Sequence, residues 1–390
     1  MRNTSISDLI TKSIDRTKFI LFDPISIKKW IYLLFIAYMA GAIGGGSGGN
    51  NFGGREKNAE ASIKQEFALA QNNNSYNKQI IKPVQESNPL IKASEPLTNQ
   101  NNYSKKGNFS DLFSNISPAS LPFIIIGFIF VAAITVLFTW LSSRFKFVWF
   151  NSIHNDTYCI VEPFGKYQAE GNSLFKVLLT LAVVGILSFA IVAGITLFSI
   201  NSAGGFDKSF NWTFFVGLKM LIAPILILLS IIVFFGILTV CIDHFTVTIM
   251  AMDKCLFGEA WKKFTIIYKE NTKDFWLYIL VLIGLGIASG IISTIIAVIV
   301  IIALMLVAVI IFGLLFVIFQ MIMKANIIFT IVAFALGIPF ALATFILLIS
   351  IGLPFAVFFR NFSLYFISSL DCGYSPLSLD NFDDIKTINI

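Results

Sequence analysis

The residues whose spacing most suggests chemistry are glycines near the N-terminus. Residues 41–54 read GAIGGGSGGNNFGG, and Gly44, Gly46 and Gly49 fit the dinucleotide-binding pattern G-x-G-x-x-G. That pattern binds phosphate where a strand precedes it and a helix follows, so that backbone amides converge on the anion. Here an apolar run precedes it and an Asn-rich polar segment follows, and no G-K-[ST] is present. We therefore interpret the stretch as the end of a membrane segment or as a flexible linker.

Side chains that could bind a metal or act as catalytic groups are few and scattered. His154 and His244 are the only histidines, without H-x-x-x-H spacing, and the four cysteines form no C-x-x-C. A metal site needs three or four convergent ligands, so we predict no metal and no cofactor. Glu162 and Glu259 could act as an acid–base pair only if their loops converge. The simpler interpretation is that each carboxylate complements a helix N-terminus, and the sequence favours a non-enzymatic protein.

The elements that must position these residues are membrane helices. The chain is 56% hydrophobic and 13% charged, with a mean hydropathy of +0.81. Soluble domains are about 45–50% apolar and about 25% charged. A spanning helix needs roughly 20 apolar residues, and several stretches exceed that length. The apolar runs lack the period-2 alternation of a membrane β-barrel. We predict an all-α polytopic membrane protein of six or seven spans, because 275–359 can hold two long kinked helices or, as we favour, three ordinary ones.

Composition also divides the chain into segments. Residues 1–22 read as an amphipathic helix that Ser5 and Asp8 cap and Asp23-Pro24 ends, with Lys and Arg side chains able to reach head groups. The remaining boundaries follow from changes in polarity. We predict an interfacial N-terminal segment at 1–28, a first membrane span at 29–45, a Gly/Asn-rich disordered external loop at 46–118, a membrane helical bundle at 119–360 and a polar C-terminal tail at 361–390.

The basic residues predict an orientation. Six Lys or Arg lie in residues 1–29, whereas loop 201–212 has only Lys208. The positive-inside rule then places the N-terminus in the cytoplasm and the protein in the cytoplasmic (inner) membrane. The net charge of +6 is concentrated beside apolar spans. It therefore favours membrane lipids as partners and gives no reason to expect nucleic acid.

Two cytoplasmic loops resemble each other. One reads E-P-F-G-K-Y at Glu162–Tyr167 and the other E-A-W-K-K-F at Glu259–Phe264, and an apolar span opens after each. This pattern predicts two parallel helix–elbow–helix repeats, although shared interfacial composition could also produce it.

Basic and aromatic residues at the predicted membrane edges are the candidate binding residues. We predict that they contact lipid head groups or a membrane protein partner; the alternative is a small-solute or lipid transporter with its site between the repeats. The candidate lipid or interface contacts are Lys28, Lys29, Trp30, Glu162, Phe164, Lys166, Glu259, Trp261, Lys262 and Lys263. The candidate packing glycines are Gly41, Gly44, Gly45 and Gly46.

Short motifs beside the spans carry a family resemblance. They include S-R-F-K-F-V at 143–148, D-H-F-T-V at 243–247 and R-N-F-S-L-Y-F at 360–366, with E-P-F-G-K-Y and E-A-W-K-K-F between them. In this order the motifs resemble an uncharacterised family of prokaryotic integral membrane proteins. More distantly, the chain is similar to the membrane domain that precedes glycerophosphodiester phosphodiesterases. The resemblance implies membrane residence and no particular activity.

Overall fold

The computed structural model describes residues 5–43, 121–202, 214–322, 326–370 and 372–378. Every regular element in these ranges is helical, which confirms the predicted all-α class. Two short stretches, labelled η4 and η5, are π-helices. The elements are α1 (Ile6–Phe22), α2 (Ile27–Met39), α4 (Leu121–Asn155), α5 (Val161–Lys166), α6 (Gln168–Ser202), α7 (Phe214–Val240), η4 (Cys241–Thr246), α8 (Val247–Asp253), α9 (Phe257–Glu270), α10 (Thr272–Phe316), η5 (Val317–Ile322), α11 (Asn326–Ser350) and α12 (Leu353–Ser369).

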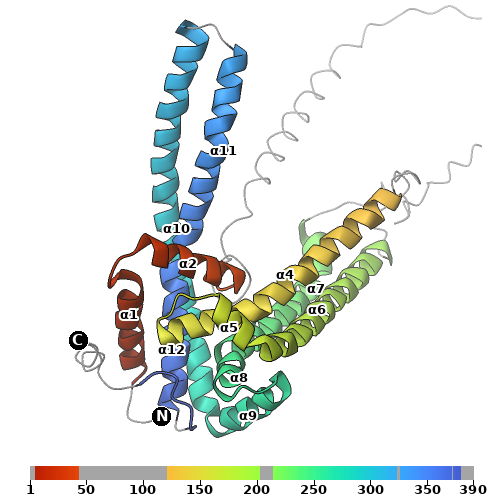
Figure 1. Cartoon of the computed structure of the whole chain (residues 1–390). Coiled ribbons are helices and arrows are strands. Elements are labelled where there is room, and N and C mark those ends of the chain that lie inside the picture. The colour runs from red at the N-terminus through yellow and green to blue at the C-terminus, as the bar shows by residue number, and fades with distance from the viewer. Residues whose placement is uncertain (1–4, 44–120, 203–213, 323–325, 371, 379–390) are drawn as a thin grey trace, which may run out of the picture.

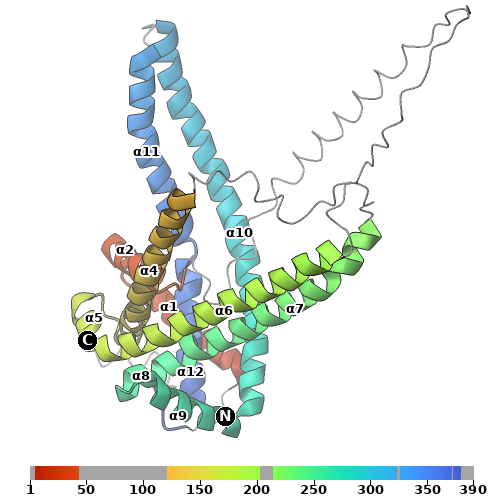
Figure 2. The same cartoon turned by 90° about the vertical axis from the view of Figure 1, so that its right-hand side faces the viewer.

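The helices form one packed end from which apolar arms project. The packed end consists of α1, α2, α5, η4, α8, α9 and α12, together with the adjoining ends of α4, α6 and α10 (Figures 1 and 2). The arms are the distal half of α4, the α6–α7 pair and the α10–α11 pair, which diverge as they leave the packed end. We use these two names, packed end and arms, throughout.

The arms have the length and surface of membrane helices. Five helices in the described residues are long and apolar enough to cross a membrane, and at most 6% of each most apolar window is buried. Alpha-helix α11 alone has 25 residues, or about 38 Å at 1.5 Å per residue, against about 30 Å of hydrocarbon. Apolar surface of this extent is compatible with lipid contact rather than with water. The chain is therefore consistent with a multi-pass membrane protein.

Three expected segments differ from the observed helices. Residues 29–45 contain α2, whose 13 residues span only about 20 Å and which packs against α4 and α12. Residues 275–359 contain most of α10, η5, α11 and the start of α12, and α10 continues unbroken through residues 299–302, where we expected one span to end and the next to begin. Residues 361–369, expected in a polar tail, are the buried second half of α12. The predicted loop at 46–118 lies outside the described residues.

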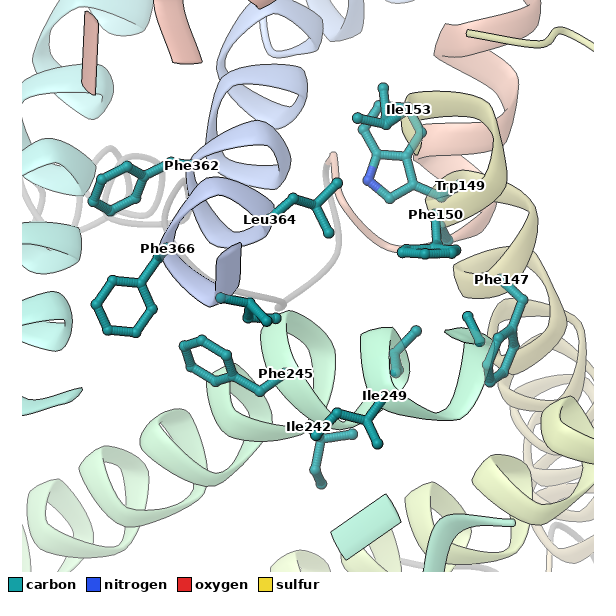
Figure 3. Close-up of a cluster of buried hydrophobic side chains, with 14 of the residues drawn as sticks. Phe147, Trp149, Phe150, Ile153, Ile242, Phe245, Ile249, Phe362, Leu364 and Phe366 are labelled. Carbon is teal, nitrogen blue, oxygen red and sulfur yellow. The ribbon is translucent and has the colours of Figure 1, made fainter. Parts of the chain in front are cut away.

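Aromatic side chains from distant parts of the sequence form the core of the packed end. Phe245 on η4 and Phe366 on α12 lie against each other with ring centroids 5.8 Å apart, and Phe147 on α4 lies at the opposite side of the same cluster (Figure 3). Tyr278 on α10 joins them, with its ring centroid 4.4 Å from that of Phe366. Such ring pairs add about 0.5–1.5 kcal/mol each beyond the apolar area that they bury.

Helix α1 begins as the sequence predicts but is not a free interfacial helix. Ser5 and Asp8 form a complete capping box, and the hydrogen bond from Ser5 lowers the pKa of Asp8. One face of α1 packs along α12, where the Asn361 amide donates to the Thr17 hydroxyl at 3.2 Å. The buried face includes Ser13 and Thr17, whose hydroxyls donate to their own helix. The face of α1 that its amphipathic pattern would place against lipid is therefore packed against α12.

Candidate functional site

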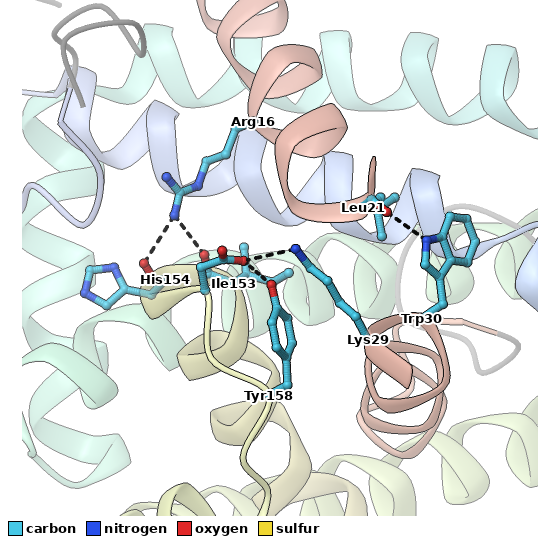
Figure 4. A network of polar contacts seen from close by, with 8 residues as sticks. Arg16, Leu21, Lys29, Trp30, Ile153, His154 and Tyr158 are labelled. Carbon is cyan, nitrogen blue, oxygen red and sulfur yellow. Dashed lines mark hydrogen bonds and ion pairs between the residues drawn. The ribbon is translucent and has the colours of Figure 1, made fainter. Parts of the chain in front are cut away.

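The predicted contacts on α2 divide into one exposed residue and two internal ones. Lys28 is exposed. Lys29 is only 7% exposed; its ammonium lies 3.9 Å from the Asp156 carboxylate and 4.9 Å from the centre of the Tyr158 ring (Figure 4). Burial lowers the pKa of Lys29, which Asp156 partly opposes. The Trp30 indole donates to the Leu21 carbonyl at 2.8 Å. Lys29 and Trp30 therefore fix α2 to the protein instead of facing lipid.

Arg16, which the sequence suggested could reach head groups, also has an internal role. Its Nη2 donates to the carbonyls of Ile153 and His154 at 3.0 and 3.2 Å (Figure 4). These are among the last carbonyls of α4, which lack partners within their own helix. Burial lowers the pKa of Arg16 below its ordinary value. The side chain caps α4 and joins it to α1.

The first elbow, α5, presents two charges, and its aromatic ring is half-buried. Glu162 and Lys166 are exposed. Phe164 packs edge-on against Phe145, and the Arg144 guanidinium lies 5.1 Å from its ring centre. The two charged residues are therefore the more accessible members of this predicted set.

The second elbow, α9, also combines exposed charged residues with an aromatic ring that packs against another ring. Glu259, Lys262 and Lys263 are exposed, whereas Trp261 stacks on Phe257 with ring centroids 5.7 Å apart. Lys263 donates to the Asp253 carboxylate at 2.5 Å, and this bond raises the pKa of Lys263. In the described part of the chain no hydrogen bond joins Glu162 on α5 to Glu259 on α9.

Of the candidate packing glycines, only Gly41 belongs to the described residues; Gly44, Gly45 and Gly46 lie outside them. Gly41 has φ +75°, and an added Cβ would lie 3.7 Å from Ser142, which is an ordinary contact. The glycine is thus required by the left-handed backbone that ends α2, not by tight packing. A close approach occurs instead at Gly352, where an added Cβ would lie 3.0 Å from Ile43.

A charged pocket lies where α2, α4, η4 and α12 meet. Lys146 on α4 forms an ion pair with Asp243 on η4, and the two side chains are 12% and 10% exposed. His244 and Arg360 also line the pocket, which has a volume of about 60 Å³. The remaining wall is mostly apolar and comprises Ala40, Ala42, Trp149, Val247, Ala356 and Phe359.

The π-helix η4 explains how Asp243 can hold two partners. In an α-helix the Val247 amide would donate to the Asp243 carbonyl, but here it donates to Ile242, five residues back. The Asp243 carbonyl instead accepts a hydrogen bond from Arg360 Nη1 at 2.7 Å. One residue therefore offers its carboxylate to Lys146 and its carbonyl to Arg360.

Arg360 has donors that its protein neighbours leave unused. The residue is 6% exposed and its guanidinium lies 5.3 Å from the centre of the Phe150 ring. Nε and Nη2 are buried and have no hydrogen-bond partner among the described residues. The neighbouring His244 is held by Tyr278, with 2.6 Å between Nδ1 and the phenol oxygen. Buried unpaired donors are unfavourable and usually indicate a water, an ion or another group.

Sequence reasoning did not find this pocket. From the sequence alone, Lys146 was interpreted only as one of the basic residues of a predicted loop. Asp243 and His244 were interpreted only as polar residues at the end of a predicted span. The three residues that carry charge come from the motifs S-R-F-K-F-V, D-H-F-T-V and R-N-F-S-L-Y-F. The signal that could have found it is their position at the inner ends of apolar runs, where ionisable groups usually find one another. In the described residues no three His, Cys, Asp or Glu side chains are grouped to hold a metal.

Comparison with known proteins places the chain in a family. The model of a family of unknown function, DUF7544, matches residues 4–377, which is nearly the whole chain. No curated protein and no solved structure matches it. The comparisons thus support the resemblance to a family without a known function, and they give no support to the relation with glycerophosphodiester phosphodiesterases. The chain belongs to the DUF7544 family.

Proposed function

We propose that this DUF7544 member is a non-enzymatic membrane protein whose packed end lies at the cytoplasmic head-group region and binds anionic lipids. The arms supply the hydrocarbon-spanning surface, and the packed end supplies exposed lysines. Anionic lipids attract each basic residue near the surface by about 1 kcal/mol. The proposed orientation rests on the excess of Lys and Arg near the N-terminus.

One observation carries the proposal: cations and aromatic rings stand where the arms meet the packed end. On α4, the exposed run ends at Phe138, and the half-buried Trp140 follows, with the buried Arg144 guanidinium 4.5 Å from its ring centre. On α10, exposed Lys273 is followed by Trp276, which is 52% exposed. Amphipathic rings and cations concentrate at the head-group level of membrane proteins.

The structure narrows the residues that can serve this function. Lys29, Trp30 and Phe164 take part in internal packing, so we remove them from the lipid-contact set. Lys28, Lys166, Lys262 and Lys263 remain, from α2, α5 and α9. Helices α4–α5–α6 and α7–α9–α10 have the order expected of two helix–elbow–helix units, and we keep the repeat as part of the proposal.

A four-lysine variant tests the proposal. Lys28, Lys166, Lys262 and Lys263 are replaced by Gln in the full chain, which is reconstituted into mixed phosphatidylglycerol and phosphatidylcholine bilayers. We expect the preference for phosphatidylglycerol around the protein, measured with spin-labelled lipids, to fall toward that of the bulk mixture. The loss amounts to at most about 4 kcal/mol over four sites. The matched control replaces Glu162, Glu259 and Glu270 on the same elbows with Gln and should keep or raise the preference. A four-lysine variant with unchanged preference would refute the proposal.

A second candidate function is transport of a small solute or lipid. The observation that favours it is the pocket itself, since Lys146 belongs to the first proposed repeat and Asp243 to the second. Ligand sites of transporters built from repeats lie at the interface between them. Proteoliposomes that move neither lipid nor solute would exclude this candidate and leave lipid binding untouched.

A further inference from the structure

We infer that the pocket between α4, η4 and α12 is a binding site for a single phosphate group, held by Arg360 and Lys146. This site is separate from the exposed lysines and does not depend on them. The ligand is identified by its chemistry, an oxyanion of one net negative charge, which a phospholipid head group or a soluble phosphate can supply.

The charge of the pocket favours an anion. Lys146 and Arg360 contribute two positive charges and Asp243 one negative charge, which leaves +1 with His244 neutral. A buried excess charge is unfavourable unless a counter-charge accompanies it. The Lys146–Asp243 pair has no net charge and Arg360 adds one positive charge, and the only hydrogen bond of Arg360 among the described residues is to an uncharged carbonyl.

The donors of Arg360 fit an oxyanion. Its Nε and Nη2 have no partner in the described residues, and a guanidinium can bind phosphate or carboxylate through two parallel hydrogen bonds. Phe150 lies against the guanidinium face, and Nη1 is held at the Asp243 carbonyl. These two contacts hold the guanidinium in place, and Nε and Nη2 remain buried without a partner among the described residues.

The size and walls of the pocket limit the ligand. A volume of about 60 Å³ has room for a group as small as one oxyanion. Trp149, Val247 and Phe359 form apolar wall beside the charges, suited to the carbon atoms attached to a phosphodiester.

The test titrates phosphate ligands against the purified full chain and follows its thermal unfolding midpoint at constant ionic strength. One arm uses inorganic phosphate and the other uses phosphatidylglycerol added to the detergent micelles. A saturable rise with phosphate indicates a soluble ligand, and a saturable rise with the lipid alone indicates a head group. No saturable rise in either arm overturns the inference. The four-lysine variant should keep the saturable rise, which separates the pocket from surface binding.

Substitutions locate the site. Arg360→Lys keeps the charge and loses the paired donors, and hydrogen bonds to charged groups imply an affinity about ten- to a hundredfold weaker. The control, Arg144→Lys, changes an arginine that is 8% exposed and donates to Asn172 outside the pocket, and it should bind as the wild type does. Equal affinity in both variants contradicts the inference.

If Arg360→Lys does not fold, Asp243→Asn provides a second test, because it should raise the affinity for phosphate instead of lowering it. The amide oxygen still accepts from Lys146, while the competing negative charge is gone and the net charge of the lining rises to +2. We expect tighter binding of phosphate, with a steeper salt dependence. Unchanged or weaker binding by Asp243→Asn would contradict the assignment.

Discussion

The packed end and the arms satisfy their polar groups in different ways. In the arms, hydroxyls close onto their own helix: Thr135 donates to the Val131 carbonyl at 2.9 Å and Ser188 to Val184 at 2.8 Å. In the packed end, polar groups reach across the sequence, as Arg16 does to Ile153 and Asn361 to Thr17. Lipid offers no hydrogen bonds, so a helix that faces it must be self-sufficient. Long-range polar contacts therefore identify the part of this chain in which specific binding can be built.

A single helix shows both behaviours. The first 18 residues of α4, from Leu121 to Phe138, are exposed, whereas Ser143–Ile153 has ten buried residues apart from Lys146. The change follows the sequence, from aliphatic residues to aromatic rings mixed with Arg, Lys and Asn. Helix α10 repeats this division, with Phe275 and Tyr278 buried and Ile299 61% exposed. Its 45 residues exceed one membrane thickness because part of the helix belongs to the packed end.

The largest effect should come from removing an aromatic ring in the packed end. Phe362 is 1% exposed and stacks on Tyr278 at 5.1 Å between centroids. We expect Phe362→Ala to lower the free energy of unfolding by about 3–5 kcal/mol. Phe189 on the α6 arm is 59% exposed, and Phe189→Ala should have little effect. Denaturant unfolding in micelles measures both; similar losses for the two variants would abolish the distinction between regions.

Arg16→Ala tests whether long-range polar contacts stabilise the packed end. It removes two charge-assisted hydrogen bonds to the end of α4, and bonds of this kind contribute about 1.5–3 kcal/mol to the free energy of unfolding. The control is Lys18→Ala on the same helix, which removes an exposed pair with Asp15 worth about 0–1 kcal/mol. The comparison fails if Lys18→Ala costs as much as Arg16→Ala in the same unfolding measurement.

A Gly→Ala substitution should lower the free energy of unfolding at one position on α6 and raise it at another. A Cβ on Gly171 would lie 2.8 Å from Arg144 Cγ, so Gly171→Ala should cost about 1–3 kcal/mol of unfolding free energy through overpacking. Gly185 lies in the arm with nothing within 4 Å, and Gly185→Ala should stabilise the helix by up to about 1 kcal/mol. Thermal unfolding of both variants measures the two changes in stability. A loss of stability in Gly185→Ala would mean that this part of the arm is closely packed, contrary to the structure.

The smallest effect concerns the start of α1. Ser5→Ala removes the cap and should weaken the α1–α12 contact by about 1 kcal/mol, observed as faster hydrogen exchange in the first turn. The pKa of Asp8 is below 3.8, so its stabilising contribution is complete above pH 3.8 and is lost as the pH falls through the folded-state value. On acidification of the wild type, protection in the first turn should fall, measured as the observed exchange rate relative to the intrinsic rate at the same pH. Unchanged protection, in the variant or in acid, would mean that the start of α1 is stabilised by packing alone.

The sequence predicted what local pattern determines. The cap at Ser5, the end of α1 before Asp23-Pro24 and the apolar helices are all confirmed, because capping chemistry and continuous hydrophobicity are local signals. Sequence reasoning failed where a contact joins distant residues. Lys29 was assigned to lipid although Asp156 pairs with it, and residues 361–369 were assigned to a polar tail although they form the buried second half of α12. The pocket joins Lys146 to Asp243 and Asp243 to Arg360 across separations of 97 and 117 residues, which no local pattern specifies.

The most direct test of the central claim measures the depth of each region in a bilayer. Spin labels are placed at Phe189 and Ile299 in the arms and at Lys166 and Lys262 in the packed end, in a background without the four native cysteines. All four positions are exposed in the structure. We predict that dissolved oxygen relaxes the arm labels more strongly and that an aqueous nickel chelate relaxes the packed-end labels more strongly. Arm labels that respond to the nickel chelate as the packed-end labels do would contradict the division into lipid-facing arms and a head-group-level packed end.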